Sequence, residues 1–443
     1  MCVIIALVYA ILSGFWGVVV TDLVQFVIAM FGSIALAIIA LNYVGGMEVL
    51  LSKLNELLGS DVVTDNTLKF IPPIPDTGVA TQTFWESPFS KFLIFISVMW
   101  WSHHGTDGGG YIIQRMSSAK NERHALLATL WFNIAHYALR VWPWIIVAVV
   151  SIVMFPIIPS EYSELGVKAG YPLVMNTLLG PGLKGILIVS FLAAFMSTID
   201  THLNWGVSYL IHDIYKRFFK PNESERHYVL VGKIMTVILM ILAAFTALKM
   251  QSISKAWEFI FAMGAGIGLV LILRWFWWRV NAWSEITALA TSIVITISFE
   301  IIAYFQTINN NLEYSLFGSA PSIFGMSLQV HHKLMIIVPI AIIAWVTVTF
   351  FTEPEPMTKL ESFYKRVQPG GWWGPVTSSF DHTLQPVTKG IFILWLAGVM
   401  MIYGFTFGIG NLIFQNYGAS VILFGFAGVG SYLIWNRNIS KLT

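Results

Sequence analysis

Long apolar segments, separated by mostly short polar connections, constrain this chain more than any other feature of its sequence. A helix needs about 20 predominantly apolar residues to cross the hydrocarbon core of a bilayer, and most of these segments reach that length. They fall near residues 16–43, 89–115, 125–155, 183–217, 228–250, 256–278, 284–306, 332–352, 387–408 and 411–436, with a shorter apolar run at 1–12. The pattern predicts an all-α polytopic membrane protein with about 10–11 transmembrane helices.

The composition supports this fold class and argues against others. Only 11% of the residues are charged, against about 25% in soluble domains. The net charge of +2 is too small to indicate a nucleic-acid partner, and the single cysteine, Cys2, excludes an intrachain disulfide. The sequence has no phosphate-binding loop, nucleophile elbow or zinc-protease motif. We therefore predict one membrane domain over 1–443 and no enzyme activity.

Lysine and arginine residues set the predicted orientation in the membrane. If the 116–124 loop is cytoplasmic, the cytoplasmic loops and helix ends collect most of these residues, as the positive-inside rule requires. This orientation places the carboxyl end in the cytoplasm and the first residue outside. The run at 1–12 is short for a span and follows no basic segment. We therefore expect it to be the end of a helix that begins upstream, with N-terminal helices lacking here.

Polar side chains inside apolar segments are costly, so each needs a partner or a bound ion. Ser197, Asp200 and Thr201 lie at positions i, i+3 and i+4 of the 183–217 segment and share one helix face, with Thr198 beside it. Hydroxyl and carboxylate oxygens are the ligands that a small hard cation prefers. A packing seam with hydroxyls bonded back to the helix would also explain the serine and the threonines, but it would leave the carboxylate uncompensated.

A second carboxylate, Asp22, lies in the 16–43 segment near its predicted cytoplasmic start. From there it could extend to the membrane interface, or it could face the bundle and bind an ion. The pattern alone favours neither role.

Four glycines and several polar residues interrupt the 89–115 segment. The polar side chains are those of Ser102, His103, His104, Thr106, Asp107 and Tyr111. Each glycine costs about 1 kcal/mol in a helix interior, so the stretch predicts a broken helix, which transporters use to expose backbone groups to their substrate. We rank solute binding first and packing second. A metal site ranks last, because adjacent histidines point about 100° apart on a helix.

Four sequence motifs occur in order along the chain. They are Gly14 to Gln25 (GFWGVVVTDLVQ), Tyr111 to Asn121 (YIIQRMSSAKN), Ala194 to Thr198 with His212 to Lys216 (AFMST and HDIYK), and Phe276 to Ala282 (FWWRVNA). Their order and spacing resemble the sodium:solute symporter family, which includes sodium–glucose, sodium–proline and sialic acid transporters. The resemblance implies a leucine-transporter-like inverted-repeat fold, N-terminally incomplete in this chain.

The resemblance also implies sodium as the coupling ion, bound at two sites. The main site would use the hydroxyls of Ser197 and Thr198 and the carbonyl of Ala194, completed by backbone of a helix expected upstream. The second site, which some members have, would comprise Asp22, Ser197, Asp200 and Thr201. Two carboxylates in one site need a cation between them, because like charges otherwise repel.

The match to sugar transporters departs at the predicted solute site. Asp107 lies farther from the glutamine–arginine pair than the equivalent residue of sugar transporters. His136 falls near their substrate-binding lysine and Trp257 near their substrate-binding glutamine, although a histidine such as His136 is more often a hydrogen-bonded core residue. The implied solute is therefore a small polar organic molecule, a sugar, an amino acid or a carboxylate. Its predicted binding residues are His103, His104, Asp107, Tyr111, His136 and Trp257.

These features together predict sodium-coupled symport across the cell membrane by alternating access, with sodium ions, the solute and the lipid bilayer as partners. The domain would divide into 1–155 (the remainder of the first repeat and the start of the second), 156–306 (the rest of the second) and 307–443 (additional helices). Two alternatives stay open, a transporter-like solute sensor and a truncated fragment that does not transport. The sequence does not indicate an oligomeric state.

Overall fold

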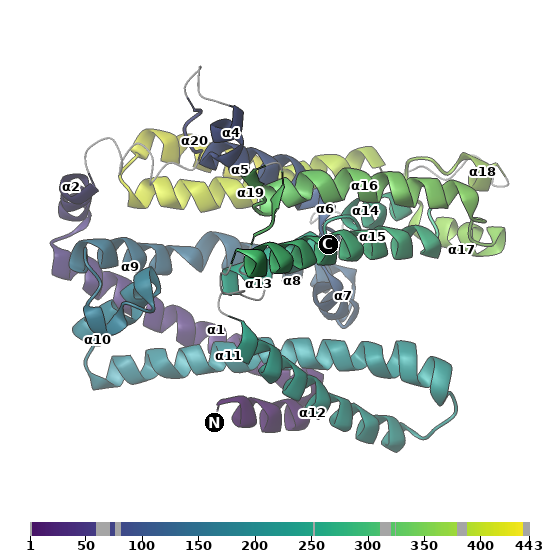
Figure 1. The fold of residues 1–443 in the computed structure, drawn as a ribbon, viewed down its shortest axis with the longest axis horizontal. Coiled ribbons are helices and arrows are strands. Elements are labelled where there is room, and N and C mark those ends of the chain that lie inside the picture. The colour runs from purple at the N-terminus through teal and green to yellow at the C-terminus, as the bar shows by residue number, and fades with distance from the viewer. Residues whose placement is uncertain are drawn as a thin grey trace. The chain divides into compact units, whose positions relative to one another are not determined.

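The computed structural model describes residues 2–58, 71–75, 81–250, 253–310, 320–323, 325–378 and 388–436. This described part of the chain is largely helical (Figure 1). Within it, eight helices are long and apolar enough to cross a membrane. They comprise Val19–Val44, Glu122–Met154, Pro181–Phe219, Glu225–Leu248, Ala282–Asn309, Val330–Phe351, Phe392–Ile413 and Tyr417–Ile434. The predicted all-α polytopic membrane fold is confirmed.

The helices group into two compact units built from interleaved segments. Unit 1 comprises Met1–Lys69, Gln114–Phe245 and Leu394–Thr443, and unit 2 comprises Phe70–Ile113 and Thr246–Ile393. The division into repeats at 155 and 306 stays a prediction.

Unit 1 is built on the pairing of two long helices, α1 (Cys2–Val44) and α11 (Pro181–Tyr209), which cross in Figure 1. Gly32 allows the close approach, since a Cβ atom there would lie 3.1 Å from the side chain of Leu187. Against α1 pack α2 (Met47–Leu58), α9 (Val141–Met154) and α10 (Gly170–Leu178). The shared core contains Leu36, Ala40, Leu50, Leu54, Val147, Val150 and Leu187.

Several helices of unit 1 continue through π-helical turns. α8 (Glu122–Asn133) runs through η3 (Ile134–Leu139) into α9, and α11 runs on into η6 (Leu210–Phe219). The other helices are η4 (Ser160–Tyr162), η5 (Gly166–Ala169), α12 (Glu225–Lys249), α19 (Thr388–Ile413) and α20 (Tyr417–Ile434). The last residues of α12 and the first residues of α19 belong to unit 2. α7 (Gly110–Ser117) begins in unit 2, and its last turn belongs to unit 1.

Unit 2 is centred on α15 (Ala282–Asn309) and α16 (Val330–Phe351), which lie side by side (Figure 1). The connection between them carries an antiparallel pair, β1 (Ser322–Ile323) and β2 (Met326–Ser327). The remaining helices are α4 (Thr81–Glu86), α5 (Pro88–Ile94), η2 (Phe95–Met99), α6 (Trp100–Ser102), α13 (Ile253–Met263), α14 (Gly268–Phe276), α17 (Met357–Val367) and α18 (Gly374–Thr377). The core joins α13, α15 and α16 through Ala262, Phe299, Leu334, Ile337 and Val338.

The observed helices depart from the predicted segments at two places and agree with the predicted break at a third. The runs at 1–12 and 16–43 form one continuous helix, α1, because a single serine and glycine between them do not stop a helix. The 89–115 segment is broken, as its glycines predicted. The 256–278 segment, predicted as one helix, is instead two helices, α13 and α14, bent by 40°.

Candidate ion and solute site

The pairing of α1 with α11 brings the first predicted motif into contact with the hydroxyl-bearing motif. Ser197 Oγ on α11 donates a hydrogen bond to Asp22 Oδ1 on α1, across 175 residues of sequence. The Ser197 side chain is half-buried, as is that of Asp22. A carboxylate and a hydroxyl from two helices therefore meet inside unit 1, where both oxygens could face a cation.

An arginine joins the same cluster. Arg115 Nη2, on the last turn of α7, lies 3.4 Å from Asp22 Oδ2 and 3.1 Å from Thr201 Oγ1. The side chains of Arg115 and Asp22 are 29% and 28% exposed, so the ion pair is partly shielded from water. The sequence placed Arg115 in a family motif but did not predict this contact. An ion pair at Asp22 could have been predicted, since a carboxylate inside a membrane span needs a cationic partner.

Thr198 faces a different direction from Ser197, because adjacent residues on a helix point about 100° apart. Its Oγ1 donates to the carbonyl oxygen of Ala194, 2.9 Å away, one turn earlier on α11. Both residues are exposed in unit 1. Two predicted oxygen ligands of the main sodium site thus lie next to each other, and each keeps a lone pair for a cation.

Asp200 is completely buried, with 0% of its surface exposed. Its Oδ1 accepts a hydrogen bond from Asn204 Nδ2 at 2.7 Å, which offsets part of the cost of burying a carboxylate. Its membership of the second sodium site stays a prediction.

The glycine-rich break in unit 2 is a compact loop between α6 and α7. Gly108 and Gly109 have φ angles of +98° and +73°, a region that glycine enters without strain. The backbone N–H of Gly105 donates to His103 Nδ1 at 2.8 Å, and that of Gly109 donates to Asp107 Oδ1 at 3.0 Å. Two of the predicted solute-binding side chains therefore help to hold the loop.

A second break, between α13 and α14, packs directly against the first. A Cβ atom at Gly264 would lie 2.3 Å from His104 Nδ1, and one at Gly268 would lie 2.3 Å from the carbonyl oxygen of Trp101. At Gly268 only glycine permits the contact, because the opposing atoms are backbone, whereas the His104 ring opposite Gly264 can turn. This break was not predicted, although the alternation of Gly264, Gly266 and Gly268 is a usable signal for it.

An ion-pair network links the two breaks. Arg274 Nη2, on α14, lies 3.1 Å from Asp107 Oδ2, and its Nη1 lies 3.0 Å from Glu285 Oε1 on α15. The Asp107 side chain is only 16% exposed, so it is the better shielded of the two carboxylates. Asp107 was predicted from sequence as a solute contact, whereas the arginine that pairs with it was not.

Aromatic rings connect three other predicted residues. The ring of Phe261 lies 6.0 Å from that of His103 and 5.5 Å from that of Trp257, and the rings of His103 and His104 are 5.8 Å apart. Phe261 was missed by the sequence analysis, because one phenylalanine in an apolar segment carries no signal. Among the described residues, no group of three or more His, Cys, Asp or Glu side chains is placed to hold a metal ion.

The remaining two predicted solute-binding residues are His136 and Tyr111. His136 belongs to unit 1 and lies in the π-helical turn η3, stacked on Phe132 at 5.1 Å, with Arg140 Nη2 3.4 Å from its Nε2. π-Helical turns occur frequently at functional sites. Tyr111 is the second residue of α7, and its side chain lies outside the described part of the structure.

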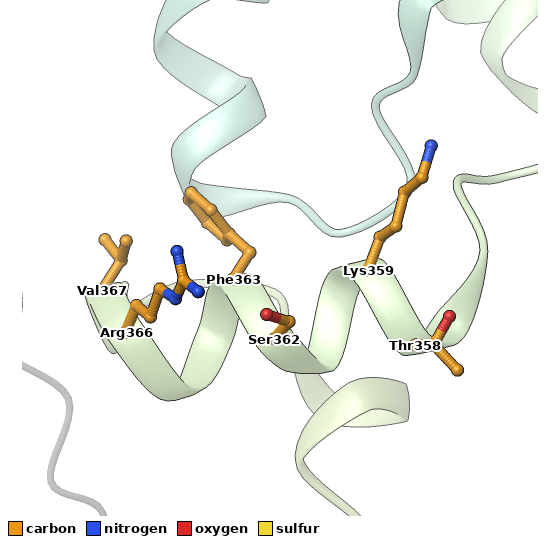
Figure 2. Close-up of a pocket in the computed structure, with 6 residues that line it drawn as sticks. All are labelled: Thr358, Lys359, Ser362, Phe363, Arg366 and Val367. Atoms are coloured by element: carbon orange, nitrogen blue, oxygen red, sulfur yellow. The ribbon is translucent and has the colours of Figure 1, made fainter.

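One surface cavity lies on α17, away from these residues in the sequence (Figure 2). Its volume is about 380 Å³. It is lined by Thr358, Lys359, Ser362, Phe363, Arg366 and Val367. A second cavity, of about 720 Å³, lies between α1 and α11 and is lined by Val27, Ile28, Phe31, Pro181, Gly182, Gly185, Ile186 and Val189. No predicted ion or solute residue lines either cavity, so the candidate site is defined by the contacts above.

Comparison with known proteins agrees with the motifs. The model of the sodium:solute symporter family matches residues 1–294. A sodium/mannose cotransporter of Bos taurus is 25% identical over 62% of this chain and 48% of its own length. Sodium/glucose cotransporter 1 of Oryctolagus cuniculus is 26% identical over 79% of this chain and 55% of its own.

A bacterial relative also matches. The osmoregulated proline transporter of Bacillus subtilis is 23% identical over 66% of this chain and 56% of its own length. The chain thus spans about half the length of the curated relatives it matches.

Proposed function

The chain belongs to the sodium:solute symporter family, and from that premise we propose that it carries out sodium-coupled symport of a small polar organic solute. The family is one of transporters. Its members similar to this chain are named for mannose, glucose and proline transport, which favours a sugar or an amino acid as the solute. Transport is proposed to proceed by alternating access across the cell membrane, with the carboxyl end in the cytoplasm.

The observation that best supports the proposal is the contact between Ser197 and Asp22. Each residue belongs to a different family motif, and each is costly in an apolar helix on its own. Their meeting places hydroxyl and carboxylate oxygens at one point between α1 and α11. Oxygen clusters of this kind suit a small hard cation.

We assign sodium to two places in unit 1. The main ion would bind near Thr198 Oγ1 and the Ala194 carbonyl, which lie 2.9 Å apart, and Ser197 is added as the third ligand on the basis of the family resemblance alone. A second ion would bind near Asp22, Ser197 and Thr201, with Asp200 as a further candidate. Since Ser197 is common to both, the two ions would influence each other's affinity.

The solute is proposed to bind at the paired breaks of unit 2. His103 and Trp257 contact Phe261, and His104 contacts His103. These rings offer aromatic faces with polar edges. Asp107 offers a carboxylate held by Arg274. Such a surface can donate to and accept from a sugar or an amino acid. Tyr111 and His136 are retained as candidates on the basis of the family resemblance alone.

Coupling would follow from a difference in affinity between states. Sodium can stabilise the outward-open, solute-ready state only by as much as it binds that state more tightly than the inward-open one. Hydroxyl ligands on α11 provide such a difference if another helix completes the site in one state only.

The test is uptake into proteoliposomes that contain the purified protein, with an imposed sodium gradient and a panel of labelled sugars, amino acids and carboxylates. We expect accumulation above equilibrium only with the gradient. Thr198→Ala should raise the sodium concentration needed for half-maximal uptake by about tenfold, the loss of one charge-assisted oxygen contact. Uptake that is identical with and without sodium would refute the proposal. Solute binding without accumulation would favour the sensor instead.

A further inference from the structure

A single guanidinium group contacts the proposed second sodium site in unit 1. Arg115 Nη2 lies 3.1 Å from Thr201 Oγ1 and 3.4 Å from Asp22 Oδ2. Ser197 Oγ donates to the other oxygen of the same carboxylate. Three of the four proposed ligands are therefore engaged by the arginine, either directly or through Asp22.

Arginine and sodium cannot use these oxygens at the same time. A guanidinium has five N–H donors and no acceptor, so it cannot help to coordinate an ion and can only add a like charge beside it. Both side chains of the Arg115–Asp22 pair are less than a third exposed, so water and salt screen this repulsion less than they would at the surface. An ion that enters the site must first displace the arginine from Asp22 and Thr201.

We propose that Arg115 is the resident cation of the second sodium site and sets the site's apparent affinity for sodium. This inference rests on the proposed function, because it takes the second site as a sodium site. When sodium binds, the guanidinium withdraws from both oxygens, and the Ser197 hydroxyl turns a lone pair toward the ion. The net charge of the site is the same before and after the exchange.

The position of Arg115 in the chain links the exchange of its guanidinium for sodium to solute binding. Arg115 lies on α7, the helix that directly follows the glycine-rich break at 103–109. A solute that shifts α7 changes how well Arg115 reaches Asp22 and therefore changes sodium affinity. By linkage, sodium then changes solute affinity by the same factor.

The test is a sodium titration of the purified protein without solute, read by binding of sodium-22 and by thermal stabilisation. Choline chloride replaces sodium chloride so that ionic strength stays constant. Arg115→Gln removes the charge and keeps amide donors, and it should lower the half-saturating sodium concentration of the second site by about fivefold. Arg123→Gln is the matched control, because Arg123 is exposed at the start of α8, and it should leave the titration unchanged.

The outcomes separate this inference from the proposed function. A half-saturating concentration that is unchanged or raised in Arg115→Gln overturns the inference. If that variant does not fold, Arg115→Lys decides in the same way, because the shorter ammonium cannot span Asp22 and Thr201 together and sodium affinity should still rise, by less. An arginine that only supports helix packing would change stability in both variants without tightening sodium binding. Absence of sodium binding to the unaltered protein would instead refute the proposed function.

Discussion

The contact between the two breaks of unit 2 predicts that one glycine tolerates no side chain. Gly268, the first residue of α14, faces the backbone of α6. A Cβ atom there would lie 2.3 Å from the carbonyl oxygen of Trp101 and 2.5 Å from the carbonyl carbon of Ser102. Carbon and oxygen atoms in close contact stay about 3.3 Å apart. Gly268→Ala must therefore move one break by roughly 1 Å relative to the other.

These distances set the loss of stability expected for Gly268→Ala. Overpacking of a core costs about 1–3 kcal/mol, and the upper end applies because the opposing atoms are backbone and cannot rotate away. Replacing glycine by alanine in a helix stabilises the helix by up to about 1 kcal/mol. The net expectation is a destabilisation of about 2 kcal/mol, or roughly 2 °C in the melting midpoint of a chain of this length.

Two further glycines supply the controls. Gly428, inside α20, has no described atom within 4 Å of the position that a Cβ atom would take, so Gly428→Ala should be neutral or stabilise by up to about 1 kcal/mol. At Gly264 the atom in the way belongs to the His104 ring, which can turn. Gly264→Ala should therefore destabilise less than Gly268→Ala.

The measurement is the melting midpoint of each variant in one detergent and at one scan rate, because unfolding of such proteins is often irreversible. Solute uptake is measured on the same preparations and should fall in Gly268→Ala and persist in Gly428→Ala. Equal melting midpoints for these two variants would refute the reasoning. The close approach of the two breaks would then contribute nothing to the free energy of unfolding.

Three other outcomes follow from the described contacts. Asp22→Asn should lower the Hill coefficient of sodium-dependent uptake toward one, and an unaltered coefficient would argue against a second ion at this carboxylate. A double-mutant cycle of Arg274→Met and Asp107→Asn should give a coupling of about 1 kcal/mol in unfolding free energy for this partly shielded pair, and additive single effects would contradict it. Gly430→Ala should destabilise α20 by about 2 kcal/mol, because its Cβ would lie 2.4 Å from the Ala397 carbonyl oxygen, and a stability equal to that of the unaltered protein would show that the two helices do not pack closely there.

The fold class and most helix positions could be predicted from sequence because the bilayer imposes a length and a polarity on every span. The break at 103–109 could be predicted for the same reason, since four glycines in an apolar segment have no other simple explanation. The break between α13 and α14 was missed. Its three alternating glycines are required by side chains and backbone on α6, α15 and α16 and by the His104 ring, which the local sequence does not contain.

In the candidate site, too, some features could be predicted from the sequence and others depended on the tertiary structure. From the sequence alone, Asp22, Ser197 and Thr201 could be selected as groups that need partners, because an unpaired polar side chain in an apolar helix is costly whatever surrounds it. Which partner each one has could not be read from the sequence. That depends on α1, α7 and α11 meeting at one point, and such long-range contacts are set by how whole helix faces pack. The tertiary structure therefore decided that Arg115 lies where a second sodium ion was predicted, and that Arg274 holds Asp107.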